Sequence, residues 1–127
     1  MMMSLFFTRN PETVCCGWTH VVALKAGRFY SWGRNNYYQC GADRITPTEP
    51  LNPEQGSKLT EIRKVVSGSE HCLALDGSGD VFSWGWNEHG NCGTGTVQNI
   101  PTPIKIVFDN KICDIFVGSA HCFASSE

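Results

Sequence analysis

Short runs of apolar residues recur along the chain, and glycine, asparagine, aspartate or proline separates each run from the next. The runs are four to six residues long and rich in β-branched and aromatic side chains, which is typical of β-strands. No stretch shows a convincing helical period. Alternation of apolar and polar positions within the runs is imperfect, which favours strands that are covered on both faces, as in propeller blades.

Four of these runs form two predicted hairpins. A short glycine-containing segment lies between the members of each pair, and glycine supplies the positive φ that a tight reversal needs. The predicted hairpins are His20–Leu24 with Phe29–Trp32, and His71–Leu75 with Val81–Trp84. A further run, Ile104–Val107, is predicted to be an outer strand. Residues 42–60 are rich in proline and are predicted to be a loop with at most one short edge strand.

The runs belong to a repeat of about fifty residues. Three Gly-x-x-His segments place histidines at positions 20, 71 and 121, which are 51 and 50 residues apart. The first two copies continue through a glycine turn, an aromatic-Ser-Trp-Gly segment, an asparagine and a late Cys-Gly pair. The spacing from the tryptophan to the last glycine is nine in both copies, Trp32 to Gly41 and Trp84 to Gly93. This regularity predicts a repeat architecture.

The register of the repeat divides the chain into segments. Residues 1–13 form a non-repeat N-terminal segment, 14–60 the first repeat, 61–110 the second repeat, and 111–127 the start of a third. We therefore expect an all-β fold in which residues 14–127 build β-propeller blades.

Composition and charge narrow the classes of partner. Ten basic and twelve acidic residues leave a net charge of -2, and no block of like charges stands out. A role in binding nucleic acid or an anionic membrane therefore has no electrostatic support. The apolar start Met1–Phe7 lacks a basic residue and is too short for a signal peptide or a membrane span.

Seven cysteines are present, which is an odd number. Without a signal peptide, this favours free thiols in a reducing compartment. We therefore expect a cytoplasmic and/or nuclear protein.

No cluster of residues predicts a metal site, a cofactor or a small-molecule substrate. No Cys-x-x-Cys pair occurs, and histidines that recur every fifty residues would lie on separate blades. The glycines of Gly77-Ser78-Gly79 precede neither a helix nor a lysine, so they are interpreted as a turn and not a phosphate loop. No catalytic constellation emerges, because the adjacent Glu-His pairs would point to opposite faces of a strand. Enzymatic activity is left undecided, with nucleotide exchange as its only candidate form.

The residues that make the repeat visible are interpreted as scaffold. Each repeat histidine is expected to order the start of its strand through a hydrogen bond to the backbone. The cysteines are expected to fill core space. Trp32 and Trp84 are expected to pack one blade against the next.

The unit Gly-x-x-His-x-x-Ala-Leu, glycine turn, aromatic-Ser-Trp-Gly, asparagine and late Cys-Gly resembles the repeat of the regulator of chromosome condensation family. The usual late motif of that family is Gly-Gln-Leu-Gly, where this chain has Tyr38-Gln39-Cys40-Gly41 and Gly90-Asn91-Cys92-Gly93. The resemblance covers about residues 14–124, and the string Trp84–Gly90 is its most specific part. It implies a partial β-propeller, about two blades of a seven-bladed ring, and a chain that is a piece of a longer propeller.

The resemblance also places the functional candidates in the loops. In exchange-factor members of the family, residues between the repeat glycine and histidine face the GTPase, and acidic ones matter there. The matching positions hold Trp18-Thr19, Ser69-Glu70 and Ser119-Ala120, of which only Glu70 is acidic. A second tryptophan after the Trp-Gly turn is not needed for packing, and aromatic loop residues often anchor interfaces. The candidate partner-binding residues are Trp18, Thr19, Glu70, Trp86, Asn87, Glu88 and His89.

Four interpretations of function follow. The first is a protein-interaction scaffold that presents its loops to a small GTPase or a small metalloprotein. The resemblance implies two alternatives: a guanine nucleotide exchange factor for a small GTPase, or a cofactor of a small zinc protein in diphthamide or tRNA modification. The last is a fragment without function.

Overall fold

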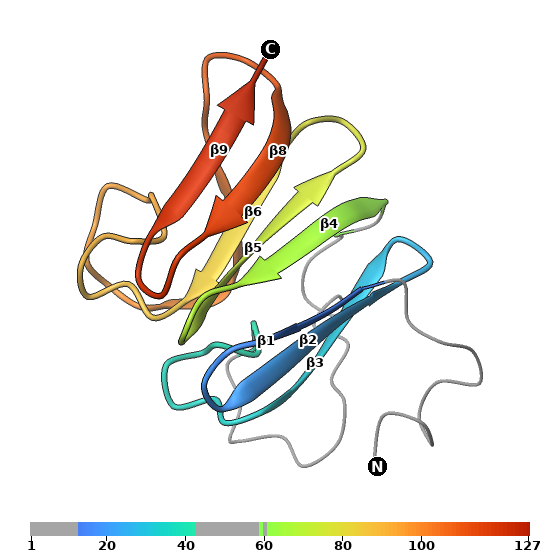
Figure 1. Cartoon of the computed structure of the whole chain (residues 1–127). Helices are drawn as coiled ribbons and strands as arrows, with labels where there is room; N and C mark the ends of the chain where they lie inside the picture. The colour runs from blue at the N-terminus through green and yellow to red at the C-terminus, as the bar shows by residue number, and fades with distance from the viewer. Residues whose placement is uncertain (1–12, 43–58, 60) are drawn as a thin grey trace.

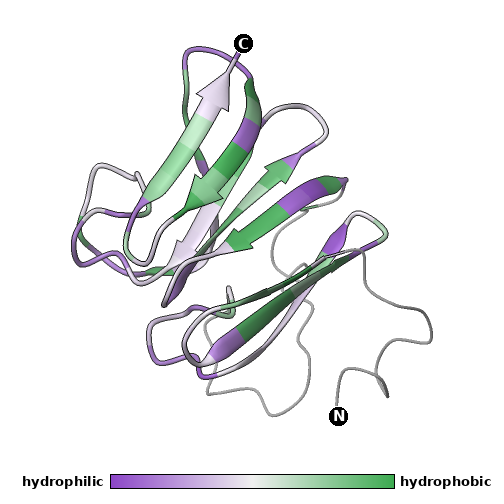
Figure 2. Ribbon diagram, viewed as in Figure 1, coloured by the Kyte–Doolittle hydropathy of each residue, from purple (hydrophilic) through white to green (hydrophobic). Residues whose placement is uncertain are grey.

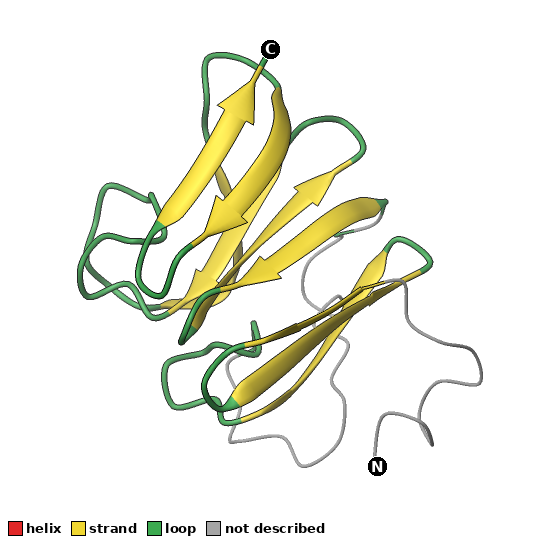
Figure 3. Cartoon of the chain, in the orientation of Figure 1, coloured by secondary structure: helices red, strands yellow, loops and turns green. Residues whose placement is uncertain are grey.

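Nine β-strands in three antiparallel sheets make up the described part of the chain (Figures 1 and 3). A computed structural model describes residues 13–42, 59 and 61–127. The strands are β1 (Thr13–Cys16), β2 (His20–Lys25), β3 (Arg28–Gly33), β4 (Ile62–Ser67), β5 (His71–Asp76), β6 (Val81–Gly85), β7 (Ile100–Ile106), β8 (Ile112–Val117) and β9 (Cys122–Ser126). These residues contain no helix, and hence none that could span a membrane.

Each sheet corresponds to one copy of the sequence repeat. The strand order is β1-β2-β3 in the first sheet, β4-β5-β6-β7 in the second and β8-β9 in the third. The three sheets pack one after another in sequence order. Strand β4 lies next to the first sheet, and β8 lies next to the second (Figure 1). The repeat boundaries set from the sequence stay predictions, and residues 1–12 of the N-terminal segment lie outside the described residues.

Both predicted hairpins are confirmed. Strand β2 pairs with β3 so that Leu24 lies opposite Phe29, and β5 pairs with β6 so that Leu75 lies opposite Val81. Ala26 and Gly27 form the first turn with φ of 52° and 76°, the left-handed backbone that a two-residue hairpin loop requires. In the second turn, the Asp76 carboxylate accepts hydrogen bonds from the backbone N–H of Ser78 and of Asp80.

Two apolar layers lie between the sheets. The layer between the first and second sheets centres on Phe29, whose ring stacks on Trp84 with 4.6 Å between centroids. The layer between the second and third sheets contains Leu73, Val81 and Ile115. Strand β5 contributes to both layers, so its residues His71 to Leu75 are all buried. Green segments in Figure 2 mark apolar residues of β2, β4 and β8, which face these layers among others. Because β5 is covered on both faces, apolar and polar positions do not alternate strictly along its sequence.

Strand β7 begins at Ile100 and not at the predicted Ile104. It therefore includes Pro101 and Pro103, which precede the predicted strand. Proline cannot donate to a ladder, but β7 pairs only with β6 and forms the edge of its sheet, where proline is tolerated. The predicted loop at 42–60 lies outside the described residues apart from Ala42 and Leu59.

Candidate protein-interaction face

The turns that carry the Gly-x-x-His segments lie side by side at one end of the sheets. The backbone N–H of Trp18 donates to the carbonyl of Ser69 at 2.9 Å, and the N–H of Ser69 donates to the carbonyl of Ser119 at 3.0 Å. Figure 1 shows these turns, and the loops that follow β3 and β6, at the same end of the strands. Candidates from different repeats thus lie on one face.

A second set of backbone hydrogen bonds fixes the turn of the chain after each Trp-Gly pair. The N–H of Arg34 donates to the carbonyl of Thr19 at 2.8 Å, and the N–H of Trp86 donates to the carbonyl of Glu70 at 2.9 Å. The preceding Gly85 has φ of 102°, and a Cβ there would lie only 2.6 Å from the Glu70 carbonyl oxygen. Glycine is therefore required at this turn, and it places Trp86 beside Glu70.

The ring of His20 packs into the next sheet, which corrects the expectation that this histidine bonds to backbone. The Nε2 atom of His20 lies 2.9 Å from Ser67 Oγ and 3.2 Å from Cys72 Sγ, both on the second sheet. Burial lowers the pKa of His20 to about 4, and the neighbouring His71 adds to the effect. His71 has no side-chain partner of this kind, because Val117 occupies in β8 the place that Ser67 holds in β4.

In the first two Gly-x-x-His segments, the glycine makes room for the histidine. A Cβ at Gly17 would lie 2.1 Å from Cε1 of His20, and one at Gly68 would lie 2.2 Å from Cε1 of His71. A Cβ at Gly118 would lie 3.8 Å from the nearest atom of His121, and the His121 side chain is exposed. The histidines that are buried are therefore scaffold residues.

Glu70 is largely covered. Its relative exposure is 9%, and its carboxylate accepts a hydrogen bond from the side-chain amide of Gln39 in the first repeat. Gln39 in turn accepts a hydrogen bond from the backbone N–H of Tyr37 at 2.8 Å. The one acidic candidate of the Gly-x-x-His turns thus joins two repeats and offers little surface to a partner.

The loop after Trp84 divides into scaffold and surface residues. Asn87 is fully buried, accepts a hydrogen bond from the N–H of Cys92 at 2.9 Å and donates to the carbonyl of Gln98 at 2.8 Å. We therefore leave Asn87 out of the candidate surface. Glu88 and His89 are exposed, and the half-buried Trp86 meets the His89 ring edge-on with 4.9 Å between centroids.

The candidate surface, called the loop face below, consists of Trp18, Thr19, Trp86, Glu88 and His89 around the covered Glu70. Trp18 is 78% exposed, an unusual state for so large an apolar side chain. Among the described residues, no three His, Cys, Asp or Glu side chains gather so as to hold a metal ion. An exposed tryptophan beside mixed polar groups suits contact with a protein surface.

Family models match most of the chain. The model of the regulator of chromosome condensation (RCC1) repeat matches residues 26–75 and 78–125, and a second RCC1 repeat model matches residues 62–91. The chain belongs to the RCC1 repeat family. The RCC1 match and the likeness to RCC1-type structures confirm the predicted fold class, an all-β partial propeller.

Relatives of the RCC1 repeat chain are much longer than it is. The secretion-regulating guanine nucleotide exchange factor of Mus musculus is 36% identical over 141 residues, covering 94% of this chain and 30% of that protein. The E3 ubiquitin-protein ligase HERC2 of Homo sapiens is 34% identical, covering 91% of this chain and 2% of that protein. Prp20p of Saccharomyces cerevisiae, described with its binding to Gsp1p and histones, superposes with a TM-score of 0.77 at 20% identity and covers 92% and 30% of the two chains. At this identity the likeness to Prp20p shows the fold alone.

Sequence reasoning missed one residue that shapes the loop face. Gln39 is fully buried, bonds to Glu70, and offers its backbone carbonyl to the indole N–H of Trp84 at 3.0 Å. The signal was present, because Gln39 and Asn91 hold the same place in the late motif. Their shared polar amide indicates a structural hydrogen bond at this position.

Proposed function

We propose that this RCC1 repeat chain is a protein-interaction scaffold and that the loop face contacts its partner. The observation that carries the proposal is the exposure of Trp18 at 78%, on a turn held in register with those of the next two repeats. A rigid aromatic side chain supplies contact area at low entropic cost, and such residues dominate binding energy at interfaces. The cytoplasmic and/or nuclear location stays a prediction.

Affinity capture with matched variants tests this proposal. The double variant Trp18→Ala, Glu88→Ala removes the aromatic anchor and a neighbouring charge, and we expect partner recovery to fall about tenfold. Val107→Ala is the control, because Val107 is 87% exposed but follows β7 at the other end of the sheet. Equal recovery with the wild-type chain and the double variant would contradict the assignment of the loop face.

The finer proposal for the partner is a small GTPase whose nucleotide release the chain accelerates. It is supported by the 36% identity to a mouse guanine nucleotide exchange factor. Because Glu70 is held by Gln39, we place the contact on Trp18 and Trp86, with Glu70 as the residue that orients the two turns. A small metalloprotein, as in diphthamide or tRNA modification, is the alternative partner.

Release of a fluorescent guanine nucleotide from a panel of small GTPases tests the exchange activity. We expect faster release from at least one GTPase, and loss of that effect in the Trp18→Ala, Glu88→Ala variant. If the capture assay recovers a partner but no GTPase of the panel releases its nucleotide faster, the exchange activity is refuted and the scaffold proposal is retained. Recovery of a zinc-containing protein by the same capture would favour the alternative partner.

A further inference from the structure

Tyr38 has a backbone conformation that a bulky side chain rarely adopts. Its φ is 63°, in the left-handed region, where the presence of a Cβ is sterically unfavourable. The other described non-glycine residues with positive φ are Ala26, in a two-residue hairpin turn, and Glu61. A strained residue persists only where the surrounding structure fixes its backbone, and such residues gather at functional sites.

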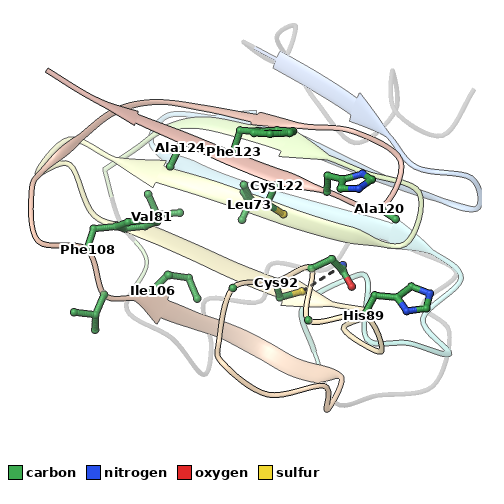
Figure 4. A pocket seen from close by; sticks show the side chains of 15 residues that line it. Leu73, Val81, His89, Cys92, Ile106, Phe108, Ala120, Cys122, Phe123 and Ala124 are labelled. Atoms are coloured by element: carbon green, nitrogen blue, oxygen red, sulfur yellow. Dashed lines mark hydrogen bonds between the residues drawn. The ribbon is translucent and has the colours of Figure 1, made fainter.

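The second repeat has glycine at the corresponding place, Gly90, which lies 52 residues after Tyr38 and has φ of 69°. The backbone N–H of Tyr38 donates to the carbonyl of Asn35 at 3.1 Å. The N–H of Gly90 donates in the same way to the carbonyl of Asn87 at 2.9 Å. Figure 4 shows this second loop from close by, with Gly90 directly after the labelled His89. The fold of the loop therefore requires the left-handed backbone at this position, but it does not require tyrosine.

Contacts within the described part of the chain do not account for the tyrosine. The side chain of Tyr38 is half-buried, and among the described residues its ring makes no aromatic contact and its hydroxyl forms no hydrogen bond. A tyrosine hydroxyl that becomes buried usually finds a hydrogen-bond partner. Contact with another molecule would supply both that partner and a surface for the ring.

The loop that carries Tyr38 adjoins the loop face. At its start, the N–H of Arg34 donates to the carbonyl of Thr19 at 2.8 Å. Directly after Tyr38, the side chain of Gln39 bonds to Glu70. Thr19 and Glu70 both belong to Gly-x-x-His turns, and the loop after β3 lies at the same end of the sheets as these turns (Figure 1). A partner on the loop face would therefore meet Tyr38 as well.

Arg34 gives this loop a charge opposite to that of its counterpart in the second repeat. Arg34 is the only charged residue of positions 34–41, and Glu88 is the only one of positions 86–93. The Arg34 side chain is exposed, and its guanidinium has no partner among the described residues. A guanidinium binds a carboxylate through two parallel hydrogen bonds. The first-repeat loop therefore suits an acidic group of a partner.

We propose that Tyr38 is a specificity-determining residue of the loop face, whose ring and hydroxyl enter a pocket on the protein partner. Arg34 pairs with a carboxylate at the rim of that pocket. The inference rests on the proposed function of the loop face and adds the kind of surface that it recognises. In this description the tyrosine lowers the stability of the chain and supplies contact area to the interface. Its removal should therefore affect binding and stability in opposite directions.

Titration with a purified partner tests the role of Tyr38. The probe is a protein that the wild-type chain recovers in the capture assay and the Trp18→Ala, Glu88→Ala variant does not. Tyr38→Gly and Tyr38→Ala both remove the ring, and each should weaken binding of this protein about tenfold. Thermal unfolding separates the two variants, because glycine relieves the strain and alanine keeps it. Tyr38→Gly should unfold no lower than the wild-type chain, and about 2–6 °C above Tyr38→Ala.

Glu61→Gly is the matched control for relief of strain. Glu61 also has a positive φ, 61°, and an exposed side chain. It lies beside the hairpin turns at the other end of the sheets, where its carbonyl accepts a hydrogen bond from the N–H of Gly77 at 3.0 Å. Glu61→Gly should unfold no lower than the wild-type chain and should leave binding within about twofold.

Arg34→Gln tests the carboxylate contact. It removes the charge and keeps a polar side chain, so binding of the same protein should weaken about threefold at low salt. The dependence of binding on salt should also become flatter than in the wild-type chain. Equal salt dependence in the two chains would overturn the contact between Arg34 and a carboxylate.

Unchanged binding by Tyr38→Gly, or a lower unfolding temperature than that of the wild-type chain, would overturn the role of Tyr38 and leave the loop face in place. A different result would remove the loop face itself. If the wild-type chain recovers no protein that the Trp18→Ala, Glu88→Ala variant loses, the proposed function fails and this inference fails with it.

Discussion

The histidine of the first repeat acts across the boundary between two sheets. His20 belongs to the first sheet, but its Nε2 atom contacts Ser67 and Cys72 of the second sheet. The contact requires a neutral ring, because the pocket that surrounds the imidazole is buried. Burial also raises the pKa of the thiols of Cys40 and Cys92 to about 12, so these side chains are uncharged core residues. Titration of the histidines should therefore affect folding.

Mild acid is expected to destabilise the chain through its buried histidines. The pKa of His20 is about 4 in the folded chain against 6.5 ordinarily, and burial lowers that of His71 as well. Below pH 6.5 the unfolded chain binds a proton that the folded chain does not. The stabilisation from His20 is therefore complete above pH 6.5 and is lost as pH falls towards 4, by about 3 kcal/mol in all.

Urea unfolding between pH 7 and pH 4.5 measures this loss. The variant His20→Gln should show a clearly flatter dependence of the unfolding free energy on pH than the wild-type chain. His89→Gln changes an exposed ring and should keep the wild-type slope. Identical slopes for all three proteins would show that His20 does not couple protonation to folding.

At the scale of strands and loops, the sequence carried most of the information about the fold. The hairpins joining β2 to β3 and β5 to β6 were predictable because their period and turn glycines are local features. The early start of β7 was not, since tolerance of Pro101 and Pro103 depends on which strand forms the edge of the sheet.

The candidate surface could be predicted only in part. The exposure of Trp18 agrees with its place on a turn. The burial of Glu70 was not predictable from its own segment, because Gln39, which covers it, belongs to another repeat. The burial of Asn87 follows from a motif that the first repeat shares, where Asn35 accepts the N–H of Cys40 at 2.9 Å. Comparing the two copies could therefore have identified Asn87 as scaffold.

At the scale of the whole molecule, each sheet depends on its neighbours for its apolar cover. Strand β5 is buried on both faces, whereas most of β9 is exposed. Ion pairs also cross between sheets, such as Lys64 with Asp114 at 2.6 Å, but water screens these half-exposed groups and they add little. The sheets are therefore held together by apolar packing between neighbours, as in other repeat proteins.

Ile115 and Phe116 provide a direct test of this description. They are adjacent in β8, but Ile115 is fully buried against the second sheet while Phe116 is 48% exposed. We expect Ile115→Ala to lower the unfolding free energy by about 2–4 kcal/mol, because it leaves a cavity between the sheets. Phe116→Ala should cost clearly less.

Hydrogen exchange locates the effect of these substitutions. In the Ile115→Ala chain, the amides of β8 and β9 should exchange faster, while those of β2, in the first sheet, should change least. Uniform acceleration over all three sheets would instead indicate one cooperative unit that opens as a whole. Equal effects of Ile115→Ala and Phe116→Ala would show that packing against β5 does not hold the third sheet in place.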